Sequence, residues 1–284
     1  MPLGGRTALI TGAGSGIGRA LAIEAARRGL AVALVGRREA ALRETRAQLA
    51  PGTECLILPG DVTLPAVRAA LRDRLAAEWG LLHFLVNNAG IVAAGPLSET
   101  RDAELDRLMA TNLVAPLALT RELLPLLRAA APGRVVNLGS MLGDIAFPLF
   151  AAYSASKFGL RGLSSALRRE LAGLGIGVTY VSPRTARTGA THAIARYVEP
   201  FRLPLDGAEV IARRTWAAAA RGRNSAYPPG RERLFALVER LSPAIIDRAV
   251  RSLVESSGTG RMIEASVPPV PVAAADGPAT GTHD

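Results

Sequence analysis

The 284-residue chain contains a single lysine, a single cysteine and few aromatic residues. Of its 34 basic residues only Lys157 is a lysine, and all the others are arginine. The lone Cys55 excludes an intramolecular disulfide, and His83, His192 and His283 are too far apart in sequence to suggest a metal-binding motif. Aromatic residues make up 4% of the chain against 49% hydrophobic residues. The core is therefore expected to be aliphatic, which suits a buried parallel sheet covered by Ala- and Leu-rich helices.

The sequence also lacks long apolar runs and long basic runs. No stretch is long and apolar enough to span a bilayer, and the start MPLGGRTALITG leads into a strand pattern rather than a signal peptide. With the single cysteine, this predicts a cytoplasmic protein without a metal. The formal net charge of +10 raises nucleic acid or an anionic membrane as partners. Because the arginines occur as scattered pairs without interleaved aromatics, a solvated surface is favoured and no nucleic-acid partner is expected.

Short apolar runs alternate with segments of helical periodicity over most of the chain. The expected strands are 7–10, 31–35, 55–58, 84–87, 134–138 and 178–181. This β-α-β-α order predicts an α/β fold: a single-domain, doubly wound, Rossmann-like parallel sheet with helices on both faces, within residues 1–260. Ligands of such sheets bind beyond the carboxyl ends of the strands.

The pattern loosens after residue 200, where an atypical helical part is expected up to about residue 260. Asp206 is predicted as a helix N-cap, with Glu209 at the third helical position. A second helix is expected over residues 231–256. Its apolar face would consist of Leu234, Leu237, Val238 and Leu241.

This last helix has three possible roles. It could cover the core, close as a lid over an apolar pocket, or rest on a membrane surface. Packing on the core is favoured, and no membrane partner is expected. The Pro- and Gly-rich segment 265–284 shows no periodicity and is predicted to be disordered.

A glycine-rich loop, TGAGSGIG at residues 11–18, follows the first strand directly. Its glycines let the backbone turn sharply and approach a pyrophosphate, which would bind the free N–H groups of the next helix. An ordinary strand-to-helix turn is the alternative, but the position of the loop favours dinucleotide binding. The second strand ends in Gly36-Arg37-Arg38 rather than in an acid, which leaves room and charge for a 2'-phosphate. NADP(H) is therefore favoured, and NAD(H) remains possible.

The only lysine lies four residues after a tyrosine in AAYSASKFGL, residues 151–160. On a helix, Tyr153 and Lys157 would point into the same space. A free phenol has a pKa near ~10 and is a poor acid-base catalyst at neutral pH, but a nearby ammonium lowers that pKa. A compact ammonium can also hydrogen-bond a ribose hydroxyl, where a planar guanidinium would fill the space differently. A purely structural Tyr-Lys pair is the alternative, which the glycine loop argues against.

The loop spacing TG-xxx-GIG resembles that of the short-chain dehydrogenase/reductase family. The resemblance extends from residue 6 to about 190 and includes NNAG at residues 87–90. It implies contacts with the cofactor from Gly12, Ser15, Gly16, Ile17, Gly18, Arg37, Asp61, Val62, Asn88, Ala89, Gly90, Tyr153, Lys157, Pro183 and Thr188.

The resemblance also implies four catalytic roles. Tyr153 would be the general acid in reduction and the base in oxidation, and Lys157 would lower its pKa and hold the nicotinamide ribose. Ser140, which could otherwise be a cap or turn residue, would orient the carbonyl. Asn112 would hold a water of the proton relay.

One position departs from the family pattern, because Arg184 replaces the glycine that usually follows Pro183 and so adds bulk and charge near the nicotinamide. By the same resemblance Phe147, Leu149 and Phe150 would line the substrate side, which suggests an apolar substrate. Buried packing is the alternative explanation of these three residues. Residues 200–260 match the family only in general layout.

The sequence thus predicts an NADP(H)-dependent oxidoreductase that interconverts a carbonyl and an alcohol on a small, apolar substrate. A homodimer or homotetramer is expected by resemblance. The principal alternative is a non-catalytic NADP(H)-binding sensor or regulatory module, which would not need the acid-base residues.

Overall fold

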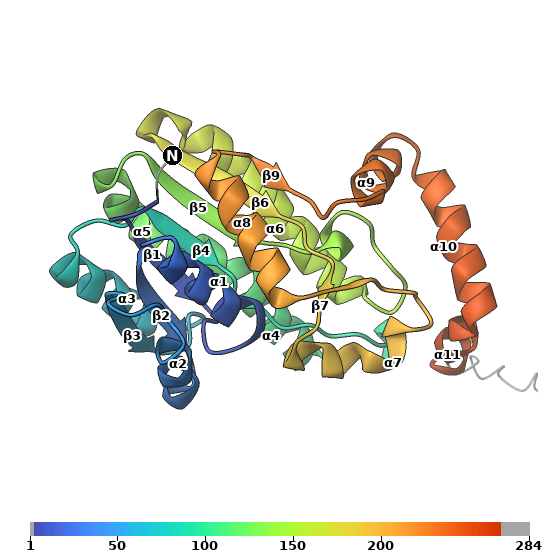
Figure 1. The fold of residues 1–284 in the computed structure, drawn as a ribbon. Coiled ribbons are helices and arrows are strands. Elements are labelled where there is room, and N and C mark those ends of the chain that lie inside the picture. Colours follow the sequence, from blue (N-terminus) through green and yellow to red (C-terminus); the bar gives the residue numbers. More distant parts are fainter. Residues whose placement is uncertain (1–2, 268–284) are drawn as a thin grey trace, which may run out of the picture.

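The computed structural model describes residues 3–267, apart from the side chains of Ala190, His192, Ala193 and Met262. Seven strands form one parallel sheet in the order β3-β2-β1-β4-β5-β6-β9 (Figure 1). They are β1 (Thr7–Thr11), β2 (Ala31–Gly36), β3 (Cys55–Pro59), β4 (Phe84–Asn87), β5 (Gly133–Leu138), β6 (Ile176–Val181) and β9 (Ser225–Ala226). The predicted fold class is confirmed, and each of the six predicted strands lies within an observed one. The two-residue β9 is too short to leave a sequence pattern.

Helices cover both faces of the sheet. The helices up to β6 are α1 (Gly16–Arg27), α2 (Glu39–Arg46), α3 (Pro65–Glu78), α4 (Asp102–Met109), α5 (Ala115–Ala129) and α6 (Ala151–Glu170). One apolar cluster packs α1, α2 and α8 (Ala208–Ala220) on one face, and another packs α3, α5 and α6 on the other. Since β1 is buried along its whole length, its residues are apolar or small on both sides.

Aliphatic side chains make up most of the core, as the composition predicts, and Trp216 is the largest of the few aromatic side chains buried with them. Trp216 of α8 is fully buried and donates its indole N–H to the Leu21 carbonyl of α1 at 2.9 Å. Its ring meets Phe84 of β4 edge to face, with centroids 5.3 Å apart. This contact fixes α8 to both α1 and the sheet.

The segment before α8 differs from the sequence prediction. Asp206 lies in the short strand β8 (Leu205–Asp206), which pairs with β7 (Thr185–Ala186), and the N-cap of α8 is Gly207. Glu209 is consequently the second helical residue rather than the third. The Asp206 carboxylate forms ion pairs with Arg184 and Arg214, so it is not available to cap the helix.

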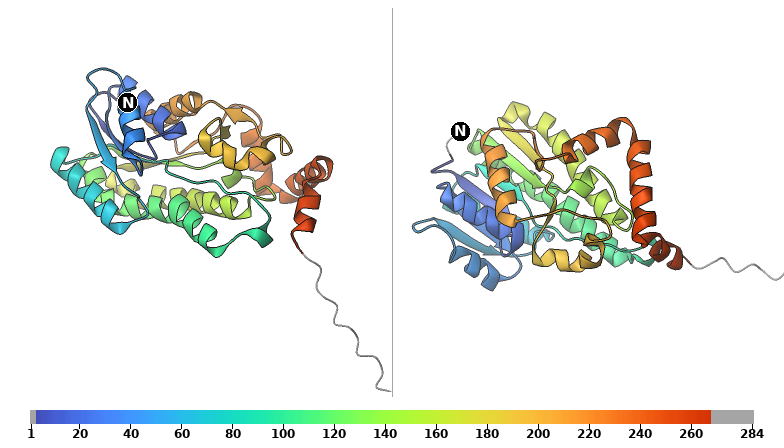
Figure 2. Two further views of the ribbon diagram at one scale, coloured as in Figure 1. Left: turned by 90° about the horizontal axis from the view of Figure 1, so that it is seen from below. Right: turned by 45° about the vertical axis from the view of Figure 1, so that its right-hand side comes forward.

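The expected helix over 231–256 is divided in two. α9 (Glu232–Leu241) ends before Pro243, the first residue of α10 (Pro243–Ser257), because proline lacks the N–H that would continue α9. α11 (Thr259–Ala265) follows, and α7 (Ala195–Val198) lies earlier in the chain. Figure 2 shows α9, α10 and α11 as an arch at one end of the molecule. The predicted disordered segment begins inside α11 at Ala265, and residues 268–284 lie outside the described part.

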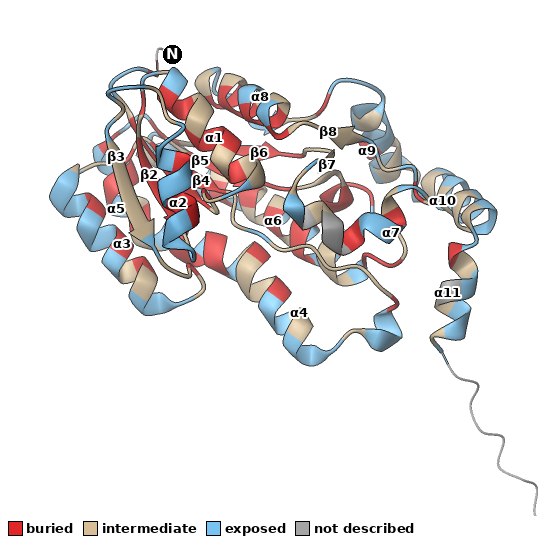
Figure 3. Cartoon of the chain, turned by 60° about the horizontal axis from the view of Figure 1, so that its bottom comes forward, coloured by how far each residue is buried: buried red, intermediate tan, exposed pale blue. Residues whose placement is uncertain are grey.

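The favoured role of α9 as a core-covering helix is wrong. Leu234, Leu237 and Leu241 are 56%, 48% and 77% exposed, whereas Ala236 on the opposite face is buried. Figure 3 shows the exposed outer sides of α9 and α10. The inner face of α9 is held by polar groups, including Glu232 and Arg240, which form ion pairs with the body of the protein. Within residues 3–267, no helix has the length and hydropathy needed to cross a membrane.

Candidate active site

A cleft opens at the carboxyl ends of β1, β4, β5 and β6, where the sheet topology predicts a ligand. Residues between Ile17 and Ile194, many of them from loops that follow strands, meet there. The lining residues are Ile17, Asn88, Gly90, Ile91, Val92, Leu138, Gly139, Ser140, Leu142, Tyr153, Lys157, Pro183, Arg184, Thr185, Ala186, Thr188, Thr191 and Ile194. The cleft thus brings together parts of the predicted glycine loop, the NNAG motif and three of the four predicted catalytic residues.

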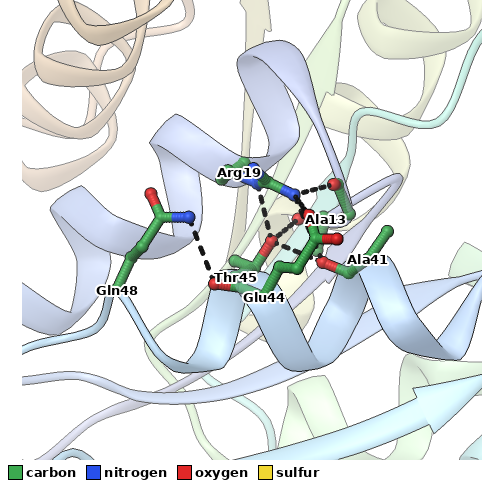
Figure 4. Close-up of polar contacts among 7 residues, drawn as sticks. Ala13, Arg19, Ala41, Glu44, Thr45 and Gln48 are labelled. Carbon is green, nitrogen blue, oxygen red and sulfur yellow. Dashed lines mark hydrogen bonds and ion pairs between the residues drawn. The ribbon is translucent and has the colours of Figure 1, made fainter.

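The glycine loop joins β1 to the N-terminus of α1, and it is held from the side by α2. Thr45 of α2 donates its hydroxyl to the Ala13 carbonyl at 2.9 Å. Arg19 of α1 donates to the Gly14 carbonyl at 2.7 Å and to the Thr45 hydroxyl at 3.0 Å, and it pairs with Glu44 (Figure 4). The sequence prediction missed Arg19 and Thr45, because only the fold brings α2 against the loop. These bonds occupy the Ala13 and Gly14 carbonyls, while the N–H groups at the start of α1 are what a phosphate requires.

Gly18 is the most tightly enclosed position of the loop. A Cβ there would overlap the Gly12 carbonyl oxygen and crowd the Asn88 amide. We expect Gly18→Ala to lower the affinity for NADPH more than tenfold, because the first turn of α1 must move away from the loop. Calorimetric titration measures this loss. Gly162→Ala on α6, where a Cβ meets nothing within 4 Å, is the matched control and is expected to bind normally; normal binding by Gly18→Ala would contradict the prediction.

The NNAG segment is bound to the end of β1 by a set of hydrogen bonds. The Thr11 hydroxyl accepts the N–H groups of Asn88 at 3.0 Å and Ala89 at 2.9 Å, and the Asn88 amide donates to the Thr11 carbonyl at 2.8 Å. The neighbouring Asn87 is buried and donates to Asn137 of β5 at 2.9 Å. Asn87 is thus a core residue, while Asn88 and Gly90 line the cleft.

Asn112 lies in a π-helical turn, Ala110–Val114, between α4 and α5. Its side chain is buried, accepts from Ile91 N–H at 2.9 Å, and donates to the Ile91 carbonyl at 2.9 Å and the Ser156 hydroxyl at 3.1 Å. Both amide donors are therefore used. Such turns are frequent at functional sites, and this one was not predicted from the sequence.

Tyr153 and Lys157 occupy successive turns of α6 and both line the cleft. Lys157 Nζ lies 5.9 Å from the centre of the Tyr153 ring and donates to the Leu138 carbonyl at 3.0 Å. A Cβ added at Gly90 would lie 3.2 Å from Asn112 Oδ1 and 3.5 Å from Lys157 Nζ. The loop after β4 is therefore close to two of the predicted catalytic residues.

The acid-base properties of this pair differ from the sequence prediction. Burial raises the pKa of the Tyr153 phenol, and hydrogen bonding with Ser140 opposes this effect. Burial lowers the pKa of Lys157 to about 8. The expected lowering of the Tyr153 pKa by Lys157 is thus wrong for this structure, because desolvation dominates and the ammonium bonds the Leu138 carbonyl.

Ser140 stands after β5, and the structure shows it in the cap role that was the alternative to a catalytic one. It is the N-cap of the 3₁₀ turn Met141–Gly143, and its hydroxyl accepts the Leu142 N–H at 3.1 Å. The same residue lines the cleft, and Tyr180 donates its phenol hydroxyl to the Ser140 carbonyl at 3.4 Å. With its acceptor used by Leu142, the Ser140 hydroxyl can donate to a carbonyl oxygen.

The loop after β6 carries Pro183, Arg184 and Thr188, all of which line the cleft. A Cβ at Gly16, whose φ is +52°, would lie 3.0 Å from the Thr188 methyl group, so Thr188 lies over the glycine loop. The Arg184 guanidinium binds Glu232 of α9, the Pro229 carbonyl at 2.7 Å and Asp206 at 3.5 Å. Two carboxylates therefore balance the charge that the sequence had placed near the nicotinamide.

Eight predicted cofactor contacts are not among the residues that line the cleft. Five of them, Gly12, Ser15, Gly16, Gly18 and Ala89, belong to the glycine loop and the NNAG segment, whose other predicted contacts do line it. The remaining three are Arg37, Asp61 and Val62. Arg37 is exposed at the end of β2, and Arg38 is the N-cap of α2. Asp61 accepts the Thr63 N–H at 2.9 Å and its hydroxyl at 2.8 Å, and Val62 is buried in the core. Arg37 follows the end of β2, which is next to β1 in the sheet, and Asp61 and Val62 follow the end of β3, which lies beyond β2. All three are on the side to which the glycine loop would direct a dinucleotide.

The predicted substrate-side residues do not line the cleft. Leu149 and Phe150 are buried in a third apolar cluster with Tyr197 and Phe201, against which Phe147 also packs. Here the prediction is wrong, because the segment around α7 covers these side chains. Apolar lining comes instead from Ile91, Val92, Leu142 and Ile194. Buried packing, the alternative for Phe147, Leu149 and Phe150, is what the structure shows.

Comparison with known proteins identifies relatives of this chain. The sequence model of a protein family described as short chain dehydrogenase matches residues 6–198. A ketoacyl reductase, HetN, from Nostoc sp. (strain PCC 7120) is 36% identical over 191 residues, which cover 66% of this chain and 67% of the relative. The 3-oxoacyl-[acyl-carrier-protein] reductase FabG of Escherichia coli is 35% identical over 67% of this chain and 78% of its own length.

Solved structures show the same fold. A short chain dehydrogenase/reductase from Burkholderia phymatum, in complex with NAD, superposes with a TM-score of 0.79 at 26% identity, over 86% of this chain and 96% of that chain. A short-chain dehydrogenase from Streptomyces avermitilis gives a TM-score of 0.73 at 31% identity, over 90% of this chain and 97% of its own.

Proposed function

The chain belongs to the short chain dehydrogenase family and is an NAD(P)-dependent oxidoreductase, and we propose that it reduces a carbonyl on a small, apolar substrate with NADPH. The observation that carries the proposal is the convergence of Ser140, Tyr153 and Lys157 in one cleft with the loops that would hold the cofactor. A binding module would need those loops but not the acid-base residues.

The residues present fit a dinucleotide. Gly12, Gly16 and Gly18 leave no space for side chains where the loop turns, and the helix N-terminus of α1 attracts a pyrophosphate. Lys157 uses one of its three donors on Leu138, which leaves donors for ribose hydroxyls. Arg37 and Arg38 supply positive charge directly after β2, and the strand end itself carries no acid. When bound, NADPH would supply the hydride.

The protein's own residues would manage the proton and the carbonyl. Tyr153, whose pKa is raised by burial, is protonated at neutral pH and would donate its proton to the developing alkoxide. Ser140 would donate a hydrogen bond to the same oxygen and orient it. Asn112, with its side chain committed to Ile91 and Ser156, would contribute to a proton relay through its backbone.

The apolar cleft lining favours an apolar substrate, and the named reductase activity of two relatives on oxoacyl groups makes β-keto esters the first class to test. The experiment follows NADPH oxidation at 340 nm with ethyl acetoacetate, cyclic ketones and aliphatic aldehydes. Turnover of any of these supports the reductase. Tight NADPH binding without turnover across the panel would favour the sensor or regulatory module.

Preference for NADPH over NADH is proposed to come from Arg37. We expect calorimetry to show tighter binding of NADPH, and Arg37→Met to weaken NADPH binding about tenfold while leaving NADH binding unchanged, because only NADPH carries the 2'-phosphate. Arg43→Met, an exposed position on α2 paired with Glu39, is the matched control. Equal losses for both cofactors would contradict this role.

The homodimer or homotetramer expected by resemblance is retained as a proposal. Val114, Leu117 and Phe158 are exposed apolar residues on the segment around α5 and on α6, the kind of surface that an oligomer covers.

A further inference from the structure

Asp144 is a fully buried carboxylate outside the predicted set of site residues. It lies directly after the turn Met141–Gly143, four residues from Ser140. Ser182 donates its hydroxyl to Asp144 Oδ2 at 2.7 Å, and Tyr227 donates to Oδ1 at 2.9 Å. Arg161 and Arg240 each approach Oδ1 at 3.2 Å. Four separate segments therefore converge on one side chain that the proposed mechanism does not use.

The geometry of these contacts ties Asp144 to the catalytic residues. Tyr153, Lys157 and Arg161 occupy successive turns of α6, so they lie along one face of the helix. Ser140 interacts with Tyr153, and Asp144 pairs with Arg161 farther along the same helix. The turn Met141–Gly143 lies between Ser140 and Asp144, so these two contacts, at different points along α6, fix its position relative to the helix. With a contact at Ser140 alone, the turn could rotate about that point.

The turn is held at both ends by backbone bonds as well. Gly139 N–H donates to the Val181 carbonyl at 2.7 Å, and Met141 N–H donates to the Pro183 carbonyl at 3.0 Å. Asp144 N–H donates to the Met141 carbonyl at 3.0 Å. The turn is thus compact, and a shift of the Asp144 side chain is passed to Ser140 over only four residues.

The C-terminal segment supplies part of this arrangement. Tyr227 and Arg240 lie beyond residue 198, where the match to the family model ends. Arg240, on α9, also donates to the Tyr227 hydroxyl at 3.2 Å. A second ion pair, between Arg184 and Glu232, holds the beginning of the same helix. The inward polar face of α9 is therefore explained by its contacts beside the cleft.

We propose that Asp144 is a positioning residue that holds Ser140 in place against Tyr153, and that Tyr227 and Arg240 complete its binding. This inference rests on the proposed reductase function. A buried carboxylate is costly unless charged and hydrogen-bonding partners surround it, and here two arginines and two hydroxyls do so. A role in holding Ser140 rigidly in place explains why the Asp144 carboxylate is kept in the interior.

The test is a double-mutant cycle on NADPH-dependent turnover of the best carbonyl of the panel. Asp144→Asn keeps the shape of the side chain but removes its charge. We expect it to lower kcat about tenfold in the wild-type background, because small displacements of a catalytic group reduce the rate strongly. In a Ser140→Ala background the same change should lower kcat less than twofold. The Kd for NADPH should stay within about twofold in every variant.

A purely structural role gives a different result. If Asp144→Asn lowers kcat by the same factor with and without Ser140, or does not lower it at all, the proposal is overturned. Normal turnover by Ser140→Ala would also overturn this proposal, because Ser140 would then have no catalytic role to be positioned for. Absence of NADPH-dependent turnover by the wild type across the panel would instead overturn the proposed function, so the two failures are distinguishable.

A second variant keeps the test decisive should Asp144→Asn fail to fold. The Arg240 side chain is 45% exposed, so Arg240→Met is expected to fold. Arg240→Met should lower kcat about threefold in the wild-type background and less than 1.5-fold in the Ser140→Ala background. Arg240→Lys, which keeps the charge, should restore at least half of the lost kcat. Arg233→Met, an exposed arginine of α9 with no ion pair among the described residues, is the matched control and should match wild type. Equal kcat for Arg240→Met and Arg233→Met would contradict the proposal.

Discussion

Tyr153→Phe is expected to lower kcat about 10³-fold while changing the Kd for NADPH less than about threefold. General acid catalysis by a positioned side chain contributes roughly 10² to 10⁴-fold, and the phenol hydroxyl is the proposed proton donor in the cleft. Removing the hydroxyl leaves the ring in place, so the glycine loop and Lys157 should still bind the cofactor. Steady-state kinetics with NADPH and the best carbonyl of the panel measures the first quantity, and calorimetry the second.

A second tyrosine provides a matched control for this change. Tyr197 is fully buried in the apolar cluster of Phe150 and Phe201, and its hydroxyl has no hydrogen-bond partner among the described residues. Tyr197→Phe should leave kcat unchanged and should not destabilise the protein, since it removes an unpaired polar group from the interior. An active Tyr153→Phe enzyme would exclude Tyr153 as the acid. Equal losses for both variants would point to packing rather than to proton transfer.

Lys157→Met is expected to be inactive yet more stable than the wild type at pH 7. The folded-state pKa of Lys157 is about 8 against an ordinary value of 10.5, because burial disfavours the ammonium. At pH 7 the lysine is charged in both states, so burying it costs about 3 kcal/mol of unfolding free energy. Replacing it loses the bond to the Leu138 carbonyl, worth about 1 kcal/mol, so a net gain of about 2 kcal/mol is expected.

The stability difference should depend on pH in a defined direction. Between pH 8 and 10.5 the unfolded lysine binds more protons than the folded one, so the stability of the wild type rises with pH through this window relative to Lys157→Met. From pH 7 to pH 9.5 the advantage of the variant should shrink by about 2 kcal/mol.

Urea unfolding of both proteins at the two pH values measures this change. Arg169→Met, an exposed cation on the same helix, is the control and should show no such dependence. A constant difference between Lys157→Met and wild type would mean that Lys157 is not charged and desolvated at neutral pH. A variant less stable than wild type at pH 7 would show that the lost hydrogen bond outweighs desolvation. Together with loss of turnover, the expected result would show that Lys157 is kept for function at the expense of stability.

Much of the site was accessible from the sequence because its elements obey local rules. The glycine loop is contiguous, and Tyr153 and Lys157 lie one turn apart on one helix. Parallel strands bring their carboxyl ends to the same edge, so the order of motifs along the chain was enough to assemble Ser140, Asn88 and Thr188 with them. The regular alternation of strands and helices likewise predicted the sheet and its covered faces.

Contacts between distant segments could not be predicted in this way. Asp144 resembles any loop acid, and its partners Arg161, Tyr227 and Arg240 lie 17 to 96 residues away. An apolar helix face usually packs inward, but α9 turns its polar face inward, because Glu232 pairs with Arg184 and Arg240 pairs with Asp144.

The sequence by itself determined the parallel α/β sheet, the loop that would bind the cofactor and the Ser140, Tyr153 and Lys157 set, since these follow from short-range spacing and the direction of the strands. Only the tertiary structure decided that the Tyr153 pKa is raised and the Lys157 pKa lowered, and that α9 turns its leucines outward, because desolvation and ion pairing depend on which distant side chains surround a group.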